Sequence, residues 1–278
     1  MSTIEPNPRV TFAVLHEDDE LAVVSKPARV VTHPGVGHEH DTLLNGLFAR
    51  WGDKLNQMGA GRDWGLVHRL DRETSGVIAV ALSHRAYDGL RAQFAERKVA
   101  KFYWAVTHKP PREPSGVIRR PIAEAVSRTS KYTSVKTGKV SASGKPAVTA
   151  YRVLAESPHA ALVEVRPVTG RLHQVRVHMN LIGCAIVGDS TYGPKRAAEA
   201  APRLGLHAHR LKFDHPVTGE TVDVRTKWPQ DLRPLLKKMQ LPRPDLSVSA
   251  GGLLPDEDEG IETDLGNIGD DAFEGSPE

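Results

Sequence analysis

The apolar runs of this chain have the length of a strand, and this limits the folds open to it. The clearest is "GVIAVAL", residues 76–82, which follows a polar segment directly. A run of this length suits a buried strand and is too short to cross a membrane as a helix. Other such runs recur with few helical patterns between them. The chain is therefore predicted to have an α+β fold, with one mixed, mostly antiparallel sheet and flanking helices.

Periodicity and turn residues place the individual elements. Apolar residues recur every four positions at Ala86, Leu90 and Phe94, which predicts an amphipathic helix. Strand-like alternation and Gly/Pro turns mark the hairpins. The expected elements are two strands within 10–25, a helix over 42–51, a helix over 84–97, a strand over 101–107, a hairpin over 147–170, a helix over 171–183 and a hairpin over 206–227.

The charge of the chain is distributed unevenly. Its 278 residues carry a net charge of +3, with 37 Lys and Arg against 34 Asp and Glu. After Gln240 the chain is strongly acidic and has Arg243 as its one basic residue, so the remainder is strongly basic. Residues 241–278 are also poor in aromatics, and we expect a disordered tail there. A basic body favours a polyanion as partner, although a solvated basic surface gives the same composition.

The sequence carries little evidence of export. The N-terminal residues contain no apolar segment of the kind found in secretory signals. Cys184 is the single cysteine, which excludes an internal disulfide and a site built from several thiolates. We expect a cytoplasmic protein with no membrane partner and, by default, a monomer.

Three familiar motifs fail when they are tested. "HRLD", residues 68–71, is similar to the kinase catalytic loop, but Gly76 stands where that loop has Asn. "GKVSASGK", residues 138–145, has glycines too far apart for a phosphate-binding loop, and Pro146 replaces its Ser or Thr. The histidines of residues 33–40 and 207–209 match no metal-ligand spacing. No metal site is expected.

What remains is Asp71, which lies beside Arg69 at the entrance to a buried strand. A carboxylate can act as a nucleophile if it stays ionised in a partly dry site, and a nearby guanidinium favours that charged form. The alternative is a structural ion pair that joins two elements, and charge and spacing alone do not separate the two readings.

A second basic segment, "GRLHQVRVH", covers residues 170–178. If it is helical, Arg171, Val175 and His178 share one face, and Arg176 lies about 100° from Val175. One arginine would then point inward and the other toward a polyanion.

Five segments resemble the motifs of the RluA family of RNA pseudouridine synthases, in the order in which that family has them. They cover roughly residues 12–227 and are "LAVVSKPARVVTHPG" with "TLLN", "HRLDRETSGVIAVAL", "KFYWAV", "VTGRLHQVRVHMNLIGCAIVGDSTYG" and "LHAHRLKFDHPVTGE". The resemblance implies the pseudouridine synthase fold, with a central cleft that has Asp71 on its floor. It also implies an isomerase that converts uridine to pseudouridine in RNA without a cofactor or metal.

The resemblance further assigns roles to individual residues. Asp71 takes the position of the catalytic aspartate, Tyr103 that of the base-stacking tyrosine, which is also a candidate for proton abstraction, and Arg176 that of the arginine paired with the aspartate. Arg171 is the alternative for the last role. Arg69 matches a position associated with insertion at the flipped base. The expected RNA-binding residues are Arg69, Arg171, His68 and Lys101.

The residues next to Asp71 also have expected structural roles. Thr74 and Ser75 are expected to hold the loop through hydroxyl-to-backbone bonds, and Gly76 to permit the turn into the strand. His68 is expected to act more as a structural hydrogen-bond partner than as a general base.

Several readings stay open at this stage. We expect residues 1–240 to form the catalytic domain, without the small RNA-binding module that many relatives carry before it. Ribosomal RNA is favoured as substrate over transfer RNA. The main rival is a non-catalytic RNA-binding or ribosome-assembly factor on the same fold. A glycosidase would need a second acid at a suitable distance, and the only acid nearby, Glu73, shows no sign of that role.

Overall fold

The computed structural model describes residues 4–128 and 134–246. The chain divides into two compact units, one formed by Met1–Tyr103 with Leu206–Asp231 and the other by Trp104–Gly205 with Leu232–Glu278. The acidic tail predicted for 241–278 lies outside the described residues beyond position 246.

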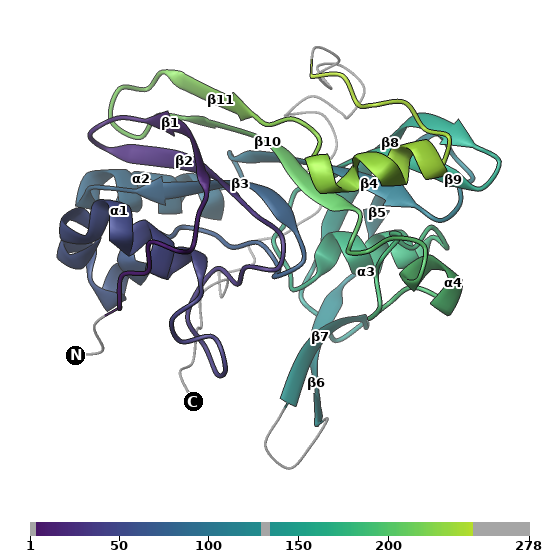
Figure 1. Ribbon diagram of the computed structural model, residues 1–278, viewed down its shortest axis with the longest axis horizontal. Coiled ribbons are helices and arrows are strands. Elements are labelled where there is room, and N and C mark those ends of the chain that lie inside the picture. Colours follow the sequence, from purple (N-terminus) through teal and green to yellow (C-terminus); the bar gives the residue numbers. More distant parts are fainter. Residues whose placement is uncertain (1–3, 129–133, 247–278) are drawn as a thin grey trace. The chain divides into compact units, whose positions relative to one another are not determined.

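In the first unit the strand order is β1-β2-β3-β10, and β11 pairs with β10 (Figure 1). β3 and β10 run parallel, whereas the pairs β1–β2, β2–β3 and β10–β11 are antiparallel. The elements of this unit are β1 (Ala13–Glu17), β2 (Leu21–Lys26), α1 (Leu43–Met58), the 3-10 helix η1 (Ala60–Gly65), β3 (Ser75–Ala81), α2 (His84–Ala95), the start of β4 (Ala100–Thr107), β10 (Leu206–Asp214), β11 (Thr221–Arg225) and the start of the 3-10 helix η2 (Gln230–Leu232).

Strand β3 is buried on both faces, as its unbroken apolar run indicates. Val77 and Ala79 pack in the cluster that includes Leu90 of α2. The alternate residues Ile78 and Val80 pack in the cluster formed with α1. Because successive strand residues point to opposite faces, each helix covers its own side of β3. The loop before β3 is thereby fixed to a rigid element.

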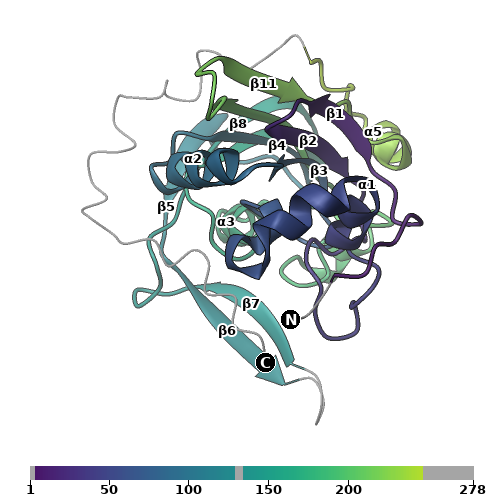
Figure 2. The same cartoon turned by 90° about the vertical axis from the view of Figure 1, so that its left-hand side faces the viewer.

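In the second unit the order is β9-β8-β5, all antiparallel, and β6 and β7 form a separate hairpin. This hairpin extends away from β8 in both views (Figures 1 and 2). The elements are the end of β4, β5 (Ser115–Arg119), β6 (Ile122–Arg128), β7 (Ser134–Val140), β8 (Val148–Ser157), β9 (Ala160–Pro167), α3 (Gln174–Leu181), α4 (Lys195–Ala198) and α5 (Arg233–Lys238).

The predicted mixed, mostly antiparallel sheet with helices is confirmed, and two details differ. Strands β5, β6 and β7 have no counterpart in the prediction. β6 and β7 pair with no other named strand, and neither IAEAVSR nor SVKTGKV has a continuous apolar face. The helix expected over 42–51 continues to Met58, because only Trp51 departs from helical geometry and Leu55 and Met58 are buried on its far side.

Candidate active site

Asp71 lies in a short loop between η1 and β3, within the first unit. The loop is closed by its own backbone, since the N–H of Thr74 donates to the Asp71 carbonyl at 3.1 Å. A second segment holds it from outside, since the N–H of Arg29 donates to the Arg72 carbonyl at 2.7 Å. The Asp71 side chain is half-buried. The carboxylate therefore stands on a loop whose main chain is fixed on both sides.

Lys26, at the end of β2, is fully buried beside this loop. Its ammonium group donates to the carbonyls of Pro27 at 2.9 Å, Val30 at 2.7 Å and Arg72 at 3.4 Å. A buried charge is tolerated when it is hydrogen-bonded in this way. Lys26 thus ties the segment after β2 to the residue that follows Asp71, a role that the sequence analysis did not assign.

The residues after Asp71 differ in part from their expected roles. Gly76 has the positive φ of +126° that a turn into the strand requires, and a Cβ there would lie 2.1 Å from the carbonyl oxygen of Ala208. The hydroxyl-to-backbone bond expected for Thr74 is wrong, because its Oγ1 is buried with no hydrogen-bond partner among the described residues. The Ser75 hydroxyl contacts Nδ1 of His207 on β10 at 2.9 Å. The loop is closed by the hydrogen bond between the Thr74 N–H and the Asp71 carbonyl, and the Thr74 hydroxyl takes no part in closing it.

Tyr103, on β4, is the second predicted catalytic residue in this unit. Its ring is half-buried and packs against the cluster formed with α1. Burial raises the pKa of Tyr103, and the charge of Asp71 raises it further. The two side chains are therefore close enough to interact, and the phenol stays protonated at neutral pH. A neutral, apolar-backed ring suits stacking better than proton abstraction.

His68 and Lys101 meet at the ring of Phe94. His68 stacks on Phe94 with 4.8 Å between ring centroids, and its Nε2 accepts the N–H of Ala79 at 2.9 Å. Burial lowers the pKa of His68 to about 3, with smaller contributions from Lys101 and His33. The Lys101 ammonium lies 5.9 Å from the Phe94 centroid. These contacts hold the His68 ring against β3 and give it a structural role. The predicted contacts of His68 and of the exposed Arg69 with RNA stay predictions.

Arg176 lies in the second unit, on α3, and is nearly buried. Its Nε and Nη2 donate to the two oxygens of Asp189 at 2.9 and 2.8 Å. Its guanidinium also lies over the Tyr192 ring, 5.0 Å from the centroid. Burial alone would raise the pKa of Asp189, but the hydrogen bond and charge of Arg176, together with the N–H groups of Tyr192 and Thr191, outweigh it and lower the pKa. A bidentate pair of this kind fixes the direction of the guanidinium.

The helix expected to contain Arg171 begins later, at Gln174, so Arg171 shares no helical face with Val175 and His178. His173 precedes the helix with a positive φ of 53°. The Gln174 side-chain oxygen accepts the N–H of Arg171 at 3.0 Å, which holds the preceding residues in a loop. Arg171 instead donates from Nε to the Pro146 carbonyl at 3.0 Å.

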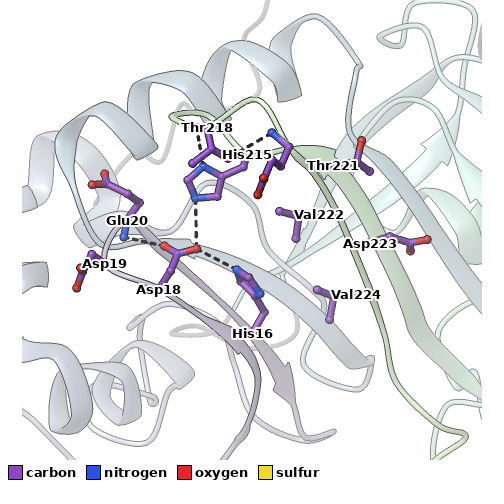
Figure 3. A pocket seen from close by; sticks show the side chains of 11 residues that line it. His16, Asp18, Asp19, Glu20, His215, Thr218, Thr221, Val222, Asp223 and Val224 are labelled. Carbon is purple, nitrogen blue, oxygen red and sulfur yellow. Dashed lines mark hydrogen bonds and ion pairs between the residues drawn. The ribbon is translucent and has the colours of Figure 1, made fainter.

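A pocket of about 520 Å³ lies elsewhere in the first unit, at the β1–β2 turn and the β10–β11 hairpin (Figure 3). Asp18 is one of its lining residues and contacts Nε2 of His16 at 3.0 Å and Nε2 of His215 at 3.2 Å. Asp18 also accepts the N–H groups of Glu20 and Leu21. The lining contains none of the predicted site residues, and its carboxylates disfavour phosphate. These contacts join the β1–β2 turn to the β10–β11 hairpin, so the cluster of polar residues has a structural role.

Neither a metal-binding cluster nor a membrane-spanning helix is found among the described residues. Within residues 4–128 and 134–246, no cluster of three or more His, Cys, Asp or Glu is arranged to hold a metal ion. Over the same residues, no helix has the length and apolarity needed to span a bilayer.

Comparison with known proteins identifies the family. Residues 20–181 match the family model described as RNA pseudouridylate synthase. The chain is 38% identical over 239 residues to ribosomal large subunit pseudouridine synthase D of Zymomonas mobilis, which covers 84% of this chain and 74% of that protein. It is 37% identical to an uncharacterized RNA pseudouridine synthase of Bacillus subtilis, over 82% of this chain and 72% of that protein.

A solved structure agrees with the sequence matches. Human RNA pseudouridylate synthase domain containing 4 superposes with a TM-score of 0.63 and 28% identity, over 84% of this chain and 94% of that chain. The arrangement of strands and the order of the motifs both agree with this family. The chain belongs to the RluA-type RNA pseudouridine synthases and is an isomerase.

Proposed function

We propose that this enzyme isomerises specific uridines of large-subunit ribosomal RNA, with Asp71 as the catalytic carboxylate. The observation that carries the chemistry is the pair formed by Asp71 and Tyr103, close enough in one unit for the carboxylate to raise the pKa of the phenol. The choice of RNA is supported by relatives named ribosomal large subunit pseudouridine synthase D, at 36% to 39% identity. Transfer RNA is the alternative substrate.

The reaction needs a site that holds two fragments at once. The bond between the ribose carbon and the uracil nitrogen breaks, the uracil turns, and the ribose carbon bonds to a ring carbon. That ring carbon loses a proton and the freed nitrogen gains one, so the composition of the nucleotide does not change. In the proposal Asp71 acts at the ribose–uracil bond and the neutral ring of Tyr103 holds the freed uracil by stacking. No cofactor or metal takes part in this scheme.

Access to the uridine has an energetic cost. A base inside a helix must be flipped out, which costs a few kcal/mol. Stacking on an aromatic ring returns about 1–3 kcal/mol. Arg69, Lys101 and Arg171 are proposed to contact RNA phosphates, which would make binding weaken as salt increases. Arg176, oriented by Asp189, is proposed to supply the guanidinium that the family pairs with its catalytic carboxylate.

The test compares pseudouridine maps of total RNA from cells that lack the protein and cells given wild type or Asp71→Asn. Sites that disappear in the deletion should return with wild type and stay absent with Asp71→Asn, because the amide cannot act as a nucleophile or base. With the purified enzyme, we expect a loss of about 10³-fold or more in kcat. The matched control is Asp88→Asn, which alters an exposed carboxylate paired with Arg62 and should restore every site.

The outcomes separate the rival functions. Restoration of all sites by Asp71→Asn would show that Asp71 is structural. A map that does not change on deletion would favour the non-catalytic RNA-binding factor. Sites that return in transfer RNA instead of ribosomal RNA would keep the chemistry and correct the substrate.

A further inference from the structure

Two buried polar atoms beside the Asp71 loop have no hydrogen-bond partner within the described part of the chain. They are Nε2 of His33 and Oγ1 of Thr74. Nearly all buried polar groups in native proteins are paired, because leaving one unpaired is costly. Nε2 of His33 is covered in the free protein, but the residue as a whole is only half-buried, so its ring has to turn outward before a partner from outside the chain can pair with that atom.

His33 is held next to the loop by the residue before it. The Thr32 hydroxyl donates to the Leu70 carbonyl at 2.8 Å and accepts the N–H of Leu70 at 3.3 Å. Both peptide groups of one loop residue are thus joined to one side chain, and this fixes the segment that carries His33 against the residue preceding Asp71. The position of His33 does not depend on any bond made by its own Nε2.

The charge state of His33 indicates which kind of chemical group can pair with its Nε2. Burial, followed by the nearby charge of Arg69, lowers the pKa of His33 to about 4, so the ring is neutral at neutral pH. A neutral imidazole offers one hydrogen bond from Nε2 and no charge for a phosphate. The adjacent guanidinium of Arg69 is the better group for a phosphate.

We propose that His33 is an RNA-contacting residue whose Nε2 forms a hydrogen bond with a neutral polar group of the target nucleoside. That group is the 2′-hydroxyl of the ribose or the 4-carbonyl oxygen of the uracil. The proposal rests on the isomerase function proposed for the Asp71 site and adds a specificity-determining residue to it. His33 is a binding residue in this account and takes no part in proton transfer.

The test uses a short RNA that carries a uridine identified in the pseudouridine map, with wild type, His33→Phe and His33→Gln. Loss of one neutral hydrogen bond predicts that His33→Phe raises KM about 3- to 10-fold, with kcat changed much less. His33→Gln keeps a donor and an acceptor and should recover part of the loss. The melting temperature of His33→Phe without RNA should equal or exceed that of wild type, because an unpaired polar atom is removed.

Thr32→Val is the structural comparison. It removes the bonds that hold the segment to Leu70, so the melting temperature and activity should fall together. An unchanged KM in His33→Phe overturns the proposal. A fall in melting temperature as large as that of Thr32→Val also overturns it, because His33 would then be structural. Inactive wild type on the mapped RNA would instead count against the proposed function.

Modified RNAs identify the contacted group. If Nε2 binds the ribose, a 2′-deoxyuridine at the target should be bound equally by wild type and His33→Phe. If it binds the uracil edge, the difference in KM should persist on that RNA and disappear when the 4-carbonyl oxygen is removed. A difference that persists on both RNAs overturns the assignment to these nucleoside groups.

Discussion

The loop that carries Asp71 and the helix that carries Arg176 hold their charged residues by different means. Around Asp71 the fixed groups are peptide carbonyls and N–H groups, joined by Lys26 and Thr32 from the segment after β2. Around Arg176 the fixed group is the guanidinium itself, held by both oxygens of Asp189. Main-chain anchoring fixes the backbone of the loop that carries Asp71, whereas side-chain anchoring sets the direction of one charged group.

This difference predicts how substitutions in each region change stability and activity. Changes near Asp71 should act on folding of the loop and of β3, and they should be large wherever the backbone itself is displaced. Changes near Arg176 should act on the orientation of the guanidinium, and activity should fall further than stability alone explains.

The largest effect on stability is expected at Gly76. In Gly76→Ala the new Cβ would lie 2.1 Å from the Ala208 carbonyl oxygen, at a φ of +126° that L-residues rarely adopt. Strain and overpacking together predict a loss of about 4 kcal/mol in the free energy of unfolding. Urea unfolding measures it. The control is Gly52→Ala in α1, where a Cβ meets nothing within 4 Å, and a helical alanine should stabilise by about 0.5–1 kcal/mol.

The next effect tests whether orientation of Arg176 matters beyond stability. Asp189→Asn removes the charge that faces a nearly buried guanidinium, and breaking such a pair costs about 3 kcal/mol. The matched control is Glu164→Gln, which weakens the equally buried pair between Arg152 and Glu164 in the same unit. Both variants should lose similar free energy of unfolding, and only Asp189→Asn should lower kcat, by about tenfold or more. Equal kcat values in the two variants would remove Asp189 from the account of the site.

The sequence was most informative where a pattern is local. The apolar run of β3 and the turn-separated strands β8–β9 and β10–β11 follow from periodicity. Asp71 and Tyr103 came from motifs that resemble a family; both lie in the first unit, where burial and then the charge of Asp71 raise the pKa of Tyr103. The hairpin β6–β7 was missed, because its strands pair with no other named strand and carry no regular apolar face.

The supporting residues were missed for another reason. Lys26 contacts the carbonyl of a residue 46 positions away, and Thr32 contacts one 38 positions away. No local period links residues at such separations, so contacts of this kind are set by the tertiary fold. One signal was available, since Lys26 is the last residue of a strand that begins with the apolar run 21–24 and is therefore a candidate for a buried, hydrogen-bonded charge. Asp189 likewise lies within a family-like segment, but its partner Arg176 is 13 residues away.

The smallest predicted effect is the pH dependence of stability that His33, the residue with the unpaired Nε2, contributes. The pKa of His33 falls from an ordinary value of 6.5 to about 4 on folding. Below pH 6.5 the unfolded chain binds a proton that the folded chain does not, so stability decreases as pH falls from 6.5 toward 4 and levels off below that. Between pH 7 and pH 5 this single group contributes a loss of up to about 2 kcal/mol.

His33→Phe removes this contribution, so its free energy of unfolding should fall less than that of wild type between pH 7 and pH 5, as urea titrations at the two pH values would show. His68, whose pKa is about 3, adds a similar dependence that remains in both proteins. If His33→Phe and wild type lose equal stability, the ring of His33 is hydrated in the free enzyme, and its Nε2 already has water as a partner before RNA arrives.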